Sequence, residues 1–442
     1  MPGPDVNRYR ARRRRLGRMH VSPRAIAYRN PSCSAAGGCG WLFLVRNLLL
    51  ATCYSNGYSR HEIARRRIVM TKTSLFRAGS AAVAASAAAL LIAACGSSSP
   101  PPNSVSPSGP GSSAPVSQAS LVAGSKKEKG LLIFSNALSS QMTAVDQAFQ
   151  KQYPWIHVTA EDDEDPVVFS KYTAEHATGT RTADLLLASA PGLWVGAVAN
   201  GLIQPYTPPG MSDFPSFVSQ GKGLYIFSPD PAITIYNKLV LKGHPAPGTV
   251  SQIVANGIAG KYKVATYTIS NNFGYTAFYA YVHQKGWAAL DQMGKTAATP
   301  GDGDVLGQDV AQGGFGVAVF ESGLARGPIE TTSAGKILGW EYTKDFTPLI
   351  PRGIGITAGA ASPDSARLYL NFVFSSAGQQ ALCDAGFEAT SNTFTPRNGC
   401  ANTLKALYAA VPEANVYMTP FSAAVAGAQA SFTARFRQAF HQ

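Results

Sequence analysis

Hydroxyl and amide side chains lie between the end of a short apolar segment (130–136) and the start of a helical pattern (141–153). They are Ser135, Asn136 and Ser139. Free N–H groups at a helix N-terminus favour an anionic or strongly dipolar ligand, so this loop could hold a small polar molecule. The same side chains can cap the helix, and the sequence leaves both roles open.

A second loop of this kind contains Ser270, Asn271 and Asn272, between a predicted strand and a predicted helix. Gly274 would let backbone approach this loop closely. Ser189, at the end of another predicted strand, adds a further hydroxyl. Two facing helix N-termini would grip an anion from both sides, so the pattern predicts a binding site for a small polar, anionic solute.

Catalytic motifs do not accompany these residues. The chain has no Gly-x-Ser-x-Gly elbow and no His-Glu-x-x-His pair, and its histidines are scattered without a recognisable partner. The acidic run 161–165 could coordinate a hard cation, but five consecutive charges usually form a solvated loop. We therefore predict no enzyme activity, no cofactor and no resident metal.

Alternating strands and helices must position these loops. Strands are predicted at 130–136, 156–161 and 183–189, with helices at 141–153 and 169–179 between them. This order implies parallel pairing with helices covering the sheet. The pattern resumes at 261–269, 315–323 and 362–386, and more than 300 residues exceed one usual core, so an α/β protein with two lobes is expected.

Net charge does not indicate a nucleic-acid partner. The formal charge is +13, but 16 of the 38 Lys and Arg residues lie in residues 1–95. From residue 96 onward, 22 basic side chains face 23 acidic ones. A phosphate backbone needs a concentrated basic face, and the sequence after Cys95 has none.

The segment from Met70 to Cys95 has the pattern of an export signal. Lys72 and Arg77 precede an apolar run of small residues and leucines, which ends in Ile-Ala-Ala-Cys. This segment resembles a bacterial lipobox, which implies cleavage before Cys95 and lipidation of its thiol. We expect a signal peptide at 70–94, a disordered Ser/Pro/Gly linker at 95–126, and a spurious or disordered extension at 1–69.

Cysteine usage is consistent with export. Beyond Cys95, only Cys383 and Cys400 remain. Outside the cytoplasm, such a pair predicts a disulfide, because no additional ligand stands at zinc spacing beside either cysteine.

Four stretches together resemble a known family. They are "AFQKQYPWIHV" (148–158), "YTAEHATGTRTADLLL" (172–187), "ITIYNKLV" (233–240) and "SPDSARLYLNFVFSSAGQQAL" (362–382). In order and spacing they are similar to the extracytoplasmic solute-binding proteins of ABC importers. The similarity is to the two-lobed group of ferric-iron, phosphonate, sugar-phosphate and thiamine binders, and covers most of residues 130–397.

The resemblance implies a type II periplasmic binding protein fold over 127–442, with two Rossmann-like α/β lobes joined by crossing strands. One lobe would take about 127–233 and 350–442, and the other about 234–349. A ligand would lie between the lobes. Tyr236 on a crossing strand, and Glu321 with Ser322 at a strand end, then become candidate site residues, with hinge packing as the alternative for Tyr236.

The resemblance further implies a monomer that is lipid-anchored on the outer face of the cell membrane and delivers its solute to an ABC permease. Ferric iron is the alternative ligand. Iron binders of the group commonly present adjacent tyrosines where this chain has Val319-Phe320-Glu321-Ser322, which disfavours iron. A structural lipoprotein or a hydrolase stays as a further alternative.

Overall fold

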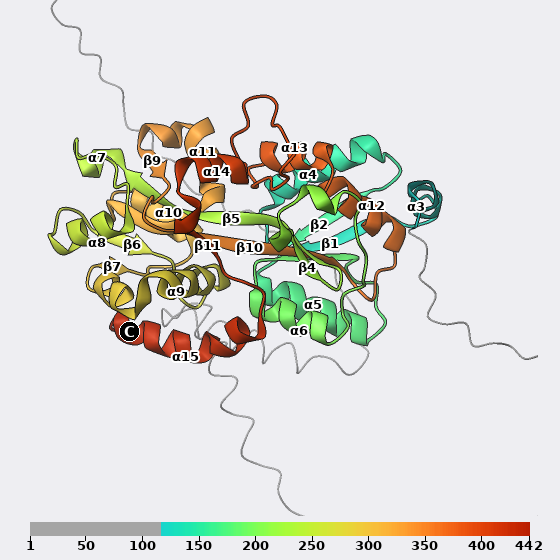
Figure 1. Cartoon of the computed structure of the whole chain (residues 1–442), viewed down its shortest axis with the longest axis horizontal. Coiled ribbons are helices and arrows are strands. Elements are labelled where there is room, and N and C mark those ends of the chain that lie inside the picture. The colour runs from blue at the N-terminus through green and yellow to red at the C-terminus, as the bar shows by residue number, and fades with distance from the viewer. Residues whose placement is uncertain (1–115) are drawn as a thin grey trace, which may run out of the picture. The chain divides into compact units, whose positions relative to one another are not determined.

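The first lobe is an α/β unit in which strands and helices alternate (Figure 1). A computed structural model of the chain describes residues 116–442. Strand β1 pairs in parallel with both β2 and β3. Because these strands are parallel, their carboxyl ends share one edge of the sheet, which places Ser135 and Ser189 near each other. The elements are β1 (Leu131–Ser135), α4 (Ser139–Gln152), β2 (Val158–Asp162), α5 (Asp165–Ala177), β3 (Leu185–Ala188) and α6 (Pro191–Ala199).

Two long strands connect the lobes (Figure 1). These are β5 (Leu224–Asn237) and β10 (Thr347–Ile356). The first half of β5 pairs antiparallel with β10, and its second half pairs with strands β8 and β9 of the other lobe. The sheet order is β2-β1-β3-β10-β5-β8-β6-β7; β4 (Ser219–Gly221) joins β5, and β11 (Val416–Met418) joins β10. The predicted α/β fold with crossing strands is confirmed.

The second lobe carries the other strands and a set of helices around its own core. Strands β6 and β8 are parallel, as are β6 and β7. Its elements are α7 (Lys238–Leu241), α8 (Val250–Ile258), β6 (Val264–Thr266), α9 (Asn272–Gly294), β7 (Ala297–Ala298), α10 (Gly303–Ala311), β8 (Val317–Ser322), α11 (Arg326–Thr331) and β9 (Leu338–Glu341).

Each lobe has apolar clusters of its own. One cluster fills the second lobe around the buried Phe278 and Phe320. Two more cover opposite faces of the first-lobe sheet, around Phe149 and Trp194. Helices α12 (Pro363–Val373) and α13 (Ser376–Asp384) pack in the first-lobe cluster around Phe149, whereas α14 (Leu404–Ala410) packs in a small cluster with Leu349 of β10. The strands are therefore fixed by packing on each lobe independently.

The C-terminal helix α15 (Ala423–Ala439) departs from the division expected from the sequence. Residues 350–442 were expected in the first lobe, yet Phe432 and Phe436 of α15 pack in the second-lobe cluster against α9. The Tyr275 hydroxyl also donates to the Val425 carbonyl oxygen, at 2.5 Å. The apolar face of α15 therefore packs on the second lobe. Helix α15 also contacts α6 of the first lobe.

The segment 95–126, expected to be a disordered linker, is helical near its end. Its last residues form helix α3 (Gln118–Ser125), which packs on α12. Leu121 is fully buried in a first-lobe cluster, and this anchor orders the helix. Cys95, the signal peptide and the N-terminal extension lie outside the described residues.

The C-terminal cysteines are paired as expected. Cys383 and Cys400 form a disulfide with their Cα atoms 6.1 Å apart. None of the helices within residues 116–442 is both long and apolar enough to span a bilayer.

Candidate functional site

A cavity of about 740 Å³ lies between the lobes. Its lining comes from the N-terminal ends of α5 and α6 on the first lobe, and of α9 and α10 on the second lobe. Helix α15 supplies one wall through Ala426 and Gln429. Volumes of several hundred Å³ suit small-molecule ligands, so this cavity can enclose a solute between two separately folded halves.

The second-lobe wall contains the loop predicted from the sequence. Ser270, Asn271 and Asn272 all line the cavity. The Asn271 side chain caps α9 by accepting from the Phe273 N–H at 2.7 Å, so its capping role and its place in the lining coexist. Gly274 is required here, because a Cβ at this position would lie 2.1 Å from the Thr268 carbonyl oxygen.

The first-lobe wall is organised by Asp165, the first residue of α5. One carboxylate oxygen accepts from the Ser189 N–H at 2.8 Å. The other accepts from the Asn272 amide at 3.4 Å, which is a direct contact between the lobes. Burial raises the pKa of Asp165 to about 6; the bond from Ser189, the charge of Arg352 and the bond from Asn272 offset the effect only in part.

Charged groups from both crossing strands lie beside this wall. Arg352 on β10 donates through Nε to Asn136 Oδ1 at 3.1 Å, and its Nη2 is 4.0 Å from Asp230 Oδ2 on β5. Asp230 also accepts from the Ser322 hydroxyl at 2.6 Å and from the Gly323 N–H at 2.9 Å. The predicted site residues Asn136 and Ser322 therefore bond to Arg352 and Asp230, respectively, and do not line the cavity.

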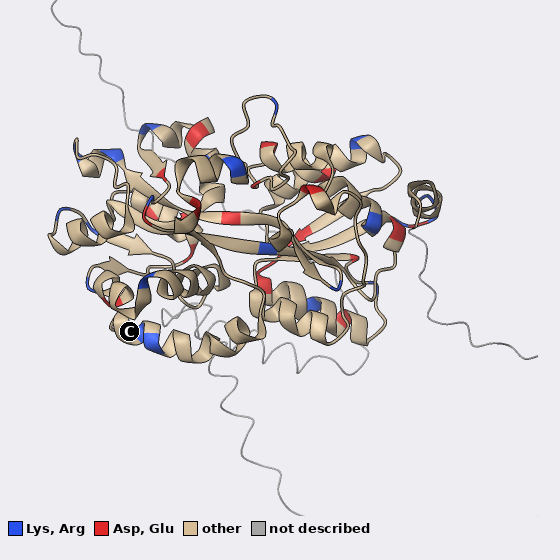
Figure 2. Cartoon of the chain, in the orientation of Figure 1, with Lys and Arg blue, Asp and Glu red and all other residues tan. Residues whose placement is uncertain are grey.

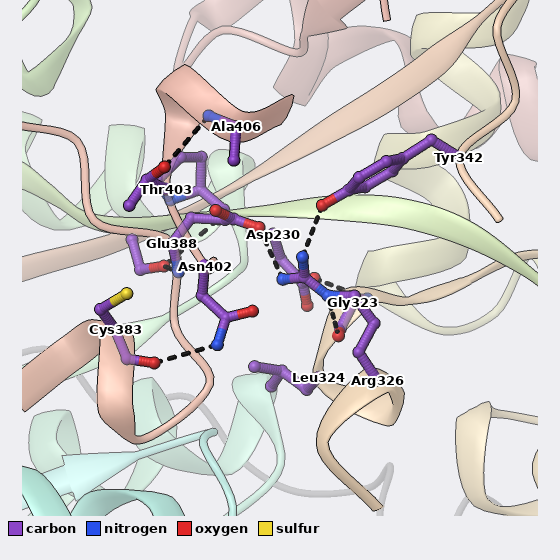
Figure 3. Close-up of polar contacts among 12 residues, drawn as sticks. Asp230, Gly323, Leu324, Arg326, Tyr342, Cys383, Glu388, Asn402, Thr403 and Ala406 are labelled. Carbon is purple, nitrogen blue, oxygen red and sulfur yellow. Dashed lines mark hydrogen bonds and ion pairs between the residues drawn. The ribbon is translucent and has the colours of Figure 1, made fainter. Parts of the chain in front are cut away.

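A second buried ion pair joins the lobes near Asp230 (Figure 3). Arg326 Nη2 of α11 lies 2.5 Å from Glu388 Oε1, and both side chains are almost fully buried. Arg326 also donates to the Gly323 carbonyl oxygen and to the Tyr342 hydroxyl. The Glu388 N–H donates to Ser228 Oγ at 2.9 Å. These contacts tie the segment after the disulfide-bonded α13 to the second lobe.

Glu321 is buried at the end of β8 with incomplete pairing. One carboxylate oxygen accepts from the Ser322 N–H at 2.8 Å, and the other has no hydrogen-bond partner among the described residues. Burial, then the nearby acidic residues, raise the pKa of Glu321 well above its usual range. Phe320, directly before it, has φ of 64° at a register shift between β5 and β8; such local strain is characteristic of functional sites.

Three predicted residues lie away from the cavity lining. The Ser135 hydroxyl is buried and accepts from the Ala137 N–H. Ser139 is exposed and bonds to Asp162 through its N–H and hydroxyl. The Tyr236 ring lies over Gly339 of β9, where a Cβ would come within 2.4 Å of it. Packing and capping account for these three positions.

Several site residues were missed by sequence reasoning. Asp165 was placed in a solvated acidic loop, yet it is 8% exposed. Asp302 caps α10 and lines the cavity. An Asp directly before the first residue of a helix, here Gly303, is the sequence signal that could have identified it. Arg352 lies within an apolar strand, and Gln429 lies on a helix that reaches the cavity only through tertiary packing.

Comparison with known proteins identifies the family. Residues 136–380, more than half of the chain, match the model for bacterial extracellular solute-binding proteins. The chain belongs to this family. No protein with a curated description matches the sequence. Since family members bind solutes, the cavity between the lobes is the natural candidate for that role.

Solved structures show the same fold at low sequence identity. A substrate-binding protein of an ABC transporter from Agrobacterium tumefaciens is 22% identical, with a TM-score of 0.62, covering 71% of this chain and 96% of that one. Iron-bound HitA from Pseudomonas aeruginosa is 14% identical, with a TM-score of 0.56 and coverage of 70% and 99%. AfuA from Actinobacillus pleuropneumoniae, with fructose-6-phosphate bound, is 15% identical, with a TM-score of 0.55 and coverage of 71% and 98%. The fold is that of a type II periplasmic binding protein.

Proposed function

We propose that this extracytoplasmic solute-binding protein captures a small polar solute in the cavity between α5 and α9 and delivers it to an ABC permease. One observation carries the proposal: polar residues of two separately packed lobes converge on a cavity of about 740 Å³. Membership of the solute-binding family supports the same function.

Closure of the lobes would complete the site. Two strands reach both lobes, which suits a hinge motion: β5 pairs with strands of each lobe, and Ile350 of β10 packs in the second-lobe cluster. The Asp165–Asn272 contact would form and separate with closure. A solute that touches both walls would therefore favour the closed state by its differential affinity.

We propose that lipidation of Cys95 holds the protein, as a monomer, at the outer face of the cell membrane. The sequence pattern at 89–95 supports this anchor. Mass spectrometry of the mature protein tests it: a diacylglyceryl adduct on an N-terminal Cys95 is expected, and an unmodified thiol would contradict it.

Ferric iron is disfavoured as the solute. One similar structure holds iron, so the donor set of this chain needs its own test. In residues 116–442, no three His, Cys, Asp or Glu side chains lie close enough to hold a metal ion. This chain has Phe320, Glu321 and Ser322 at the position where the iron binders that it resembles commonly present adjacent tyrosines.

A thermal-shift screen of the full chain tests the proposed function. A solute that binds only the folded state at a hundredfold excess over Kd adds about 2.7 kcal/mol to the free energy of unfolding. Amines, sugar phosphates, phosphonates, thiamine and ferric citrate form a suitable panel. Saturable stabilisation by one class is expected, whereas no stabilisation by any compound would favour a structural lipoprotein.

A further inference from the structure

We propose that residues 419–429, here called the strap, are a latch between the lobes. The strap comprises the segment before α15 and the first turns of that helix. It moves with the second lobe and stabilises the closed state by packing on α6 of the first lobe. Phe421 is then a positioning residue, which sets the affinity for the solute without contacting it. This inference rests on the proposed function and adds to it an element that controls closure.

Two hydrogen bonds fasten the strap to α9 of the second lobe. The Thr419 hydroxyl donates to the Thr276 carbonyl oxygen at 2.9 Å. The Tyr275 hydroxyl donates to the Val425 carbonyl oxygen at 2.5 Å. Farther along α15, aromatic side chains pack in the second-lobe cluster. Because these contacts lie on both sides of Phe421 in the chain, the strap stays with the second lobe when the lobes separate.

The Phe421 ring packs on the first lobe instead. Its centroid lies 6.5 Å from that of the fully buried Trp194 of α6, in a first-lobe cluster. Gly353 of β10 leaves room for both rings, since a Cβ there would lie 2.6 Å from Trp194 Nε1 and 3.1 Å from Phe421 Cε2. Phe421 therefore joins a segment held by the second lobe to the core of the first.

Helix α15 also approaches the first turn of α6 closely. A Cβ at Gly192 would lie 3.4 Å from the Ala426 Cβ, whereas a Cβ at Gly196, one turn along α6, would meet nothing within 4 Å. Gly192 and Ala426 line the cavity, and Phe421 does not. The strap thus closes one side of the cavity, and Phe421 packs behind it.

The contact between the strap and α6 is apolar. Neither 191–199 nor 419–429 contains Asp, Glu, Lys or Arg, and Figure 2 shows α6 and α15 without charge except toward the C-terminal part of α15. Burial of apolar surface favours this contact, and no charge has to be desolvated to form it. Each lobe keeps its own core when the contact breaks, so the latch can open without unfolding either lobe.

A latch of this kind acts on every solute alike. The apparent Kd equals the intrinsic Kd divided by the fraction of the protein in the binding-competent state. Weakening the latch lowers the closed fraction, so it weakens the binding of all solutes by one common factor. A change in a residue that touches the solute would instead affect different solutes to different extents.

Hydrogen exchange of the solute-free full chain, purified in detergent, tests the latch without a solute. Opening exposes amides in the first turns of α5 and α10, which line the cavity from the two lobes. Phe421→Ala should speed exchange there about three- to tenfold. Phe315→Ala is the matched control, since Phe315 is also partly buried but packs on the second-lobe cluster; it should change these rates less than about twofold.

A pair of glycine variants tests the second contact. Gly192→Leu puts a side chain between α6 and α15, and Gly196→Leu puts the same side chain into open space. Both changes replace glycine with a better helix former in the same helix. We expect faster exchange at the first turns of α5 and α10 in Gly192→Leu than in Gly196→Leu.

Calorimetric titration supplies a second measurement, with spermidine, glucose 6-phosphate, 2-aminoethylphosphonate, thiamine and ferric citrate as probes. Each probe that binds the wild type should bind Phe421→Ala about three- to tenfold more weakly, by a common factor. Phe315→Ala should bind it with less than about a twofold change.

Unchanged exchange at the first turns of α5 and α10 in both Phe421→Ala and Gly192→Leu would overturn the inference. Faster exchange confined to α6 and the strap would also overturn it, because Phe421 would then serve local packing alone. If no probe bound the wild type, and the thermal-shift screen failed as well, the proposed function would fall. The exchange measurement would still decide whether the strap is a latch.

Discussion

Replacing Arg326 with methionine should destabilise the protein strongly, because the change leaves Glu388 buried without its partner. Arg326 is 4% exposed and Glu388 is 1% exposed, and Nη2 and Oε1 lie 2.5 Å apart. The variant also loses the Nε bond to the Gly323 carbonyl oxygen, at 2.8 Å. Removing one partner of such a pair costs about 3–5 kcal/mol.

Urea denaturation of the full chain, followed by tryptophan fluorescence, measures this loss. The double variant Arg326→Met with Glu388→Met removes both charges and places an apolar side chain at each buried position. Replacing both members of a buried pair with apolar groups is often neutral or stabilising. We therefore expect the double variant to recover most of the stability that the single variant loses.

An exposed ion pair provides the matched control. Arg435 bonds both carboxylate oxygens of Asp291 at 2.7 Å, but the two side chains are 36% and 40% exposed. Arg435→Met should cost no more than about 1 kcal/mol. Equal losses for Arg326→Met and Arg435→Met would refute the assignment of Arg326 and Glu388 as a buried clamp between the lobes.

Two other predictions concern stability. Burial raises the folded-state pKa of Asp165 to about 6 and of Asp146 to about 7, from 3.8; the folded state thus binds more protons between these values, and stability falls as pH rises through that window. At pH 8, the unfolding free energy should therefore rise by up to about 3 kcal/mol for Asp165→Asn and by up to about 4 kcal/mol for Asp146→Asn, with little change at pH 3. Only Asp165→Asn should weaken solute binding, because Asp165 lines the cavity; a gain that is equal at both pH values would contradict the titration. Replacing Cys383 and Cys400 with serine should cost about 3 kcal/mol, since the disulfide closes a loop of 17 positions; an unchanged urea midpoint would show that the bond is dispensable.

Local patterns in the sequence were enough to predict the framework and one wall of the cavity. Strands β1, β2 and β3 were recognisable as apolar segments alternating with helices. Ser270, Asn271 and Asn272 were recognisable because polar residues at the start of a helix have few alternatives to capping or binding. Their position in the cavity lining agrees with the prediction, while their contact with a solute stays a prediction.

Residues that reach the site through tertiary contacts could not be found in this way. Asp165 resembles its solvated acidic neighbours, and its burial depends on Ser189 and on Asn272, 107 positions away. Helix α15 joins the second lobe because Phe432 packs against α9. The lining of the cavity depends on such long-range contacts, which the local pattern at a helix N-terminus does not contain.

Titration of a cavity-blocking variant tests most directly whether the cavity between α5 and α9 is the solute site. Asn272→Trp would place an indole at the contact with Asp165, and Gln292→Trp, at an exposed position of the same helix, is the control. With the solute from the thermal-shift screen, the control should bind like the wild type, and Asn272→Trp should lose binding while unfolding at a similar urea concentration. Undiminished binding by a folded Asn272→Trp variant would contradict the assignment of this cavity as the solute site.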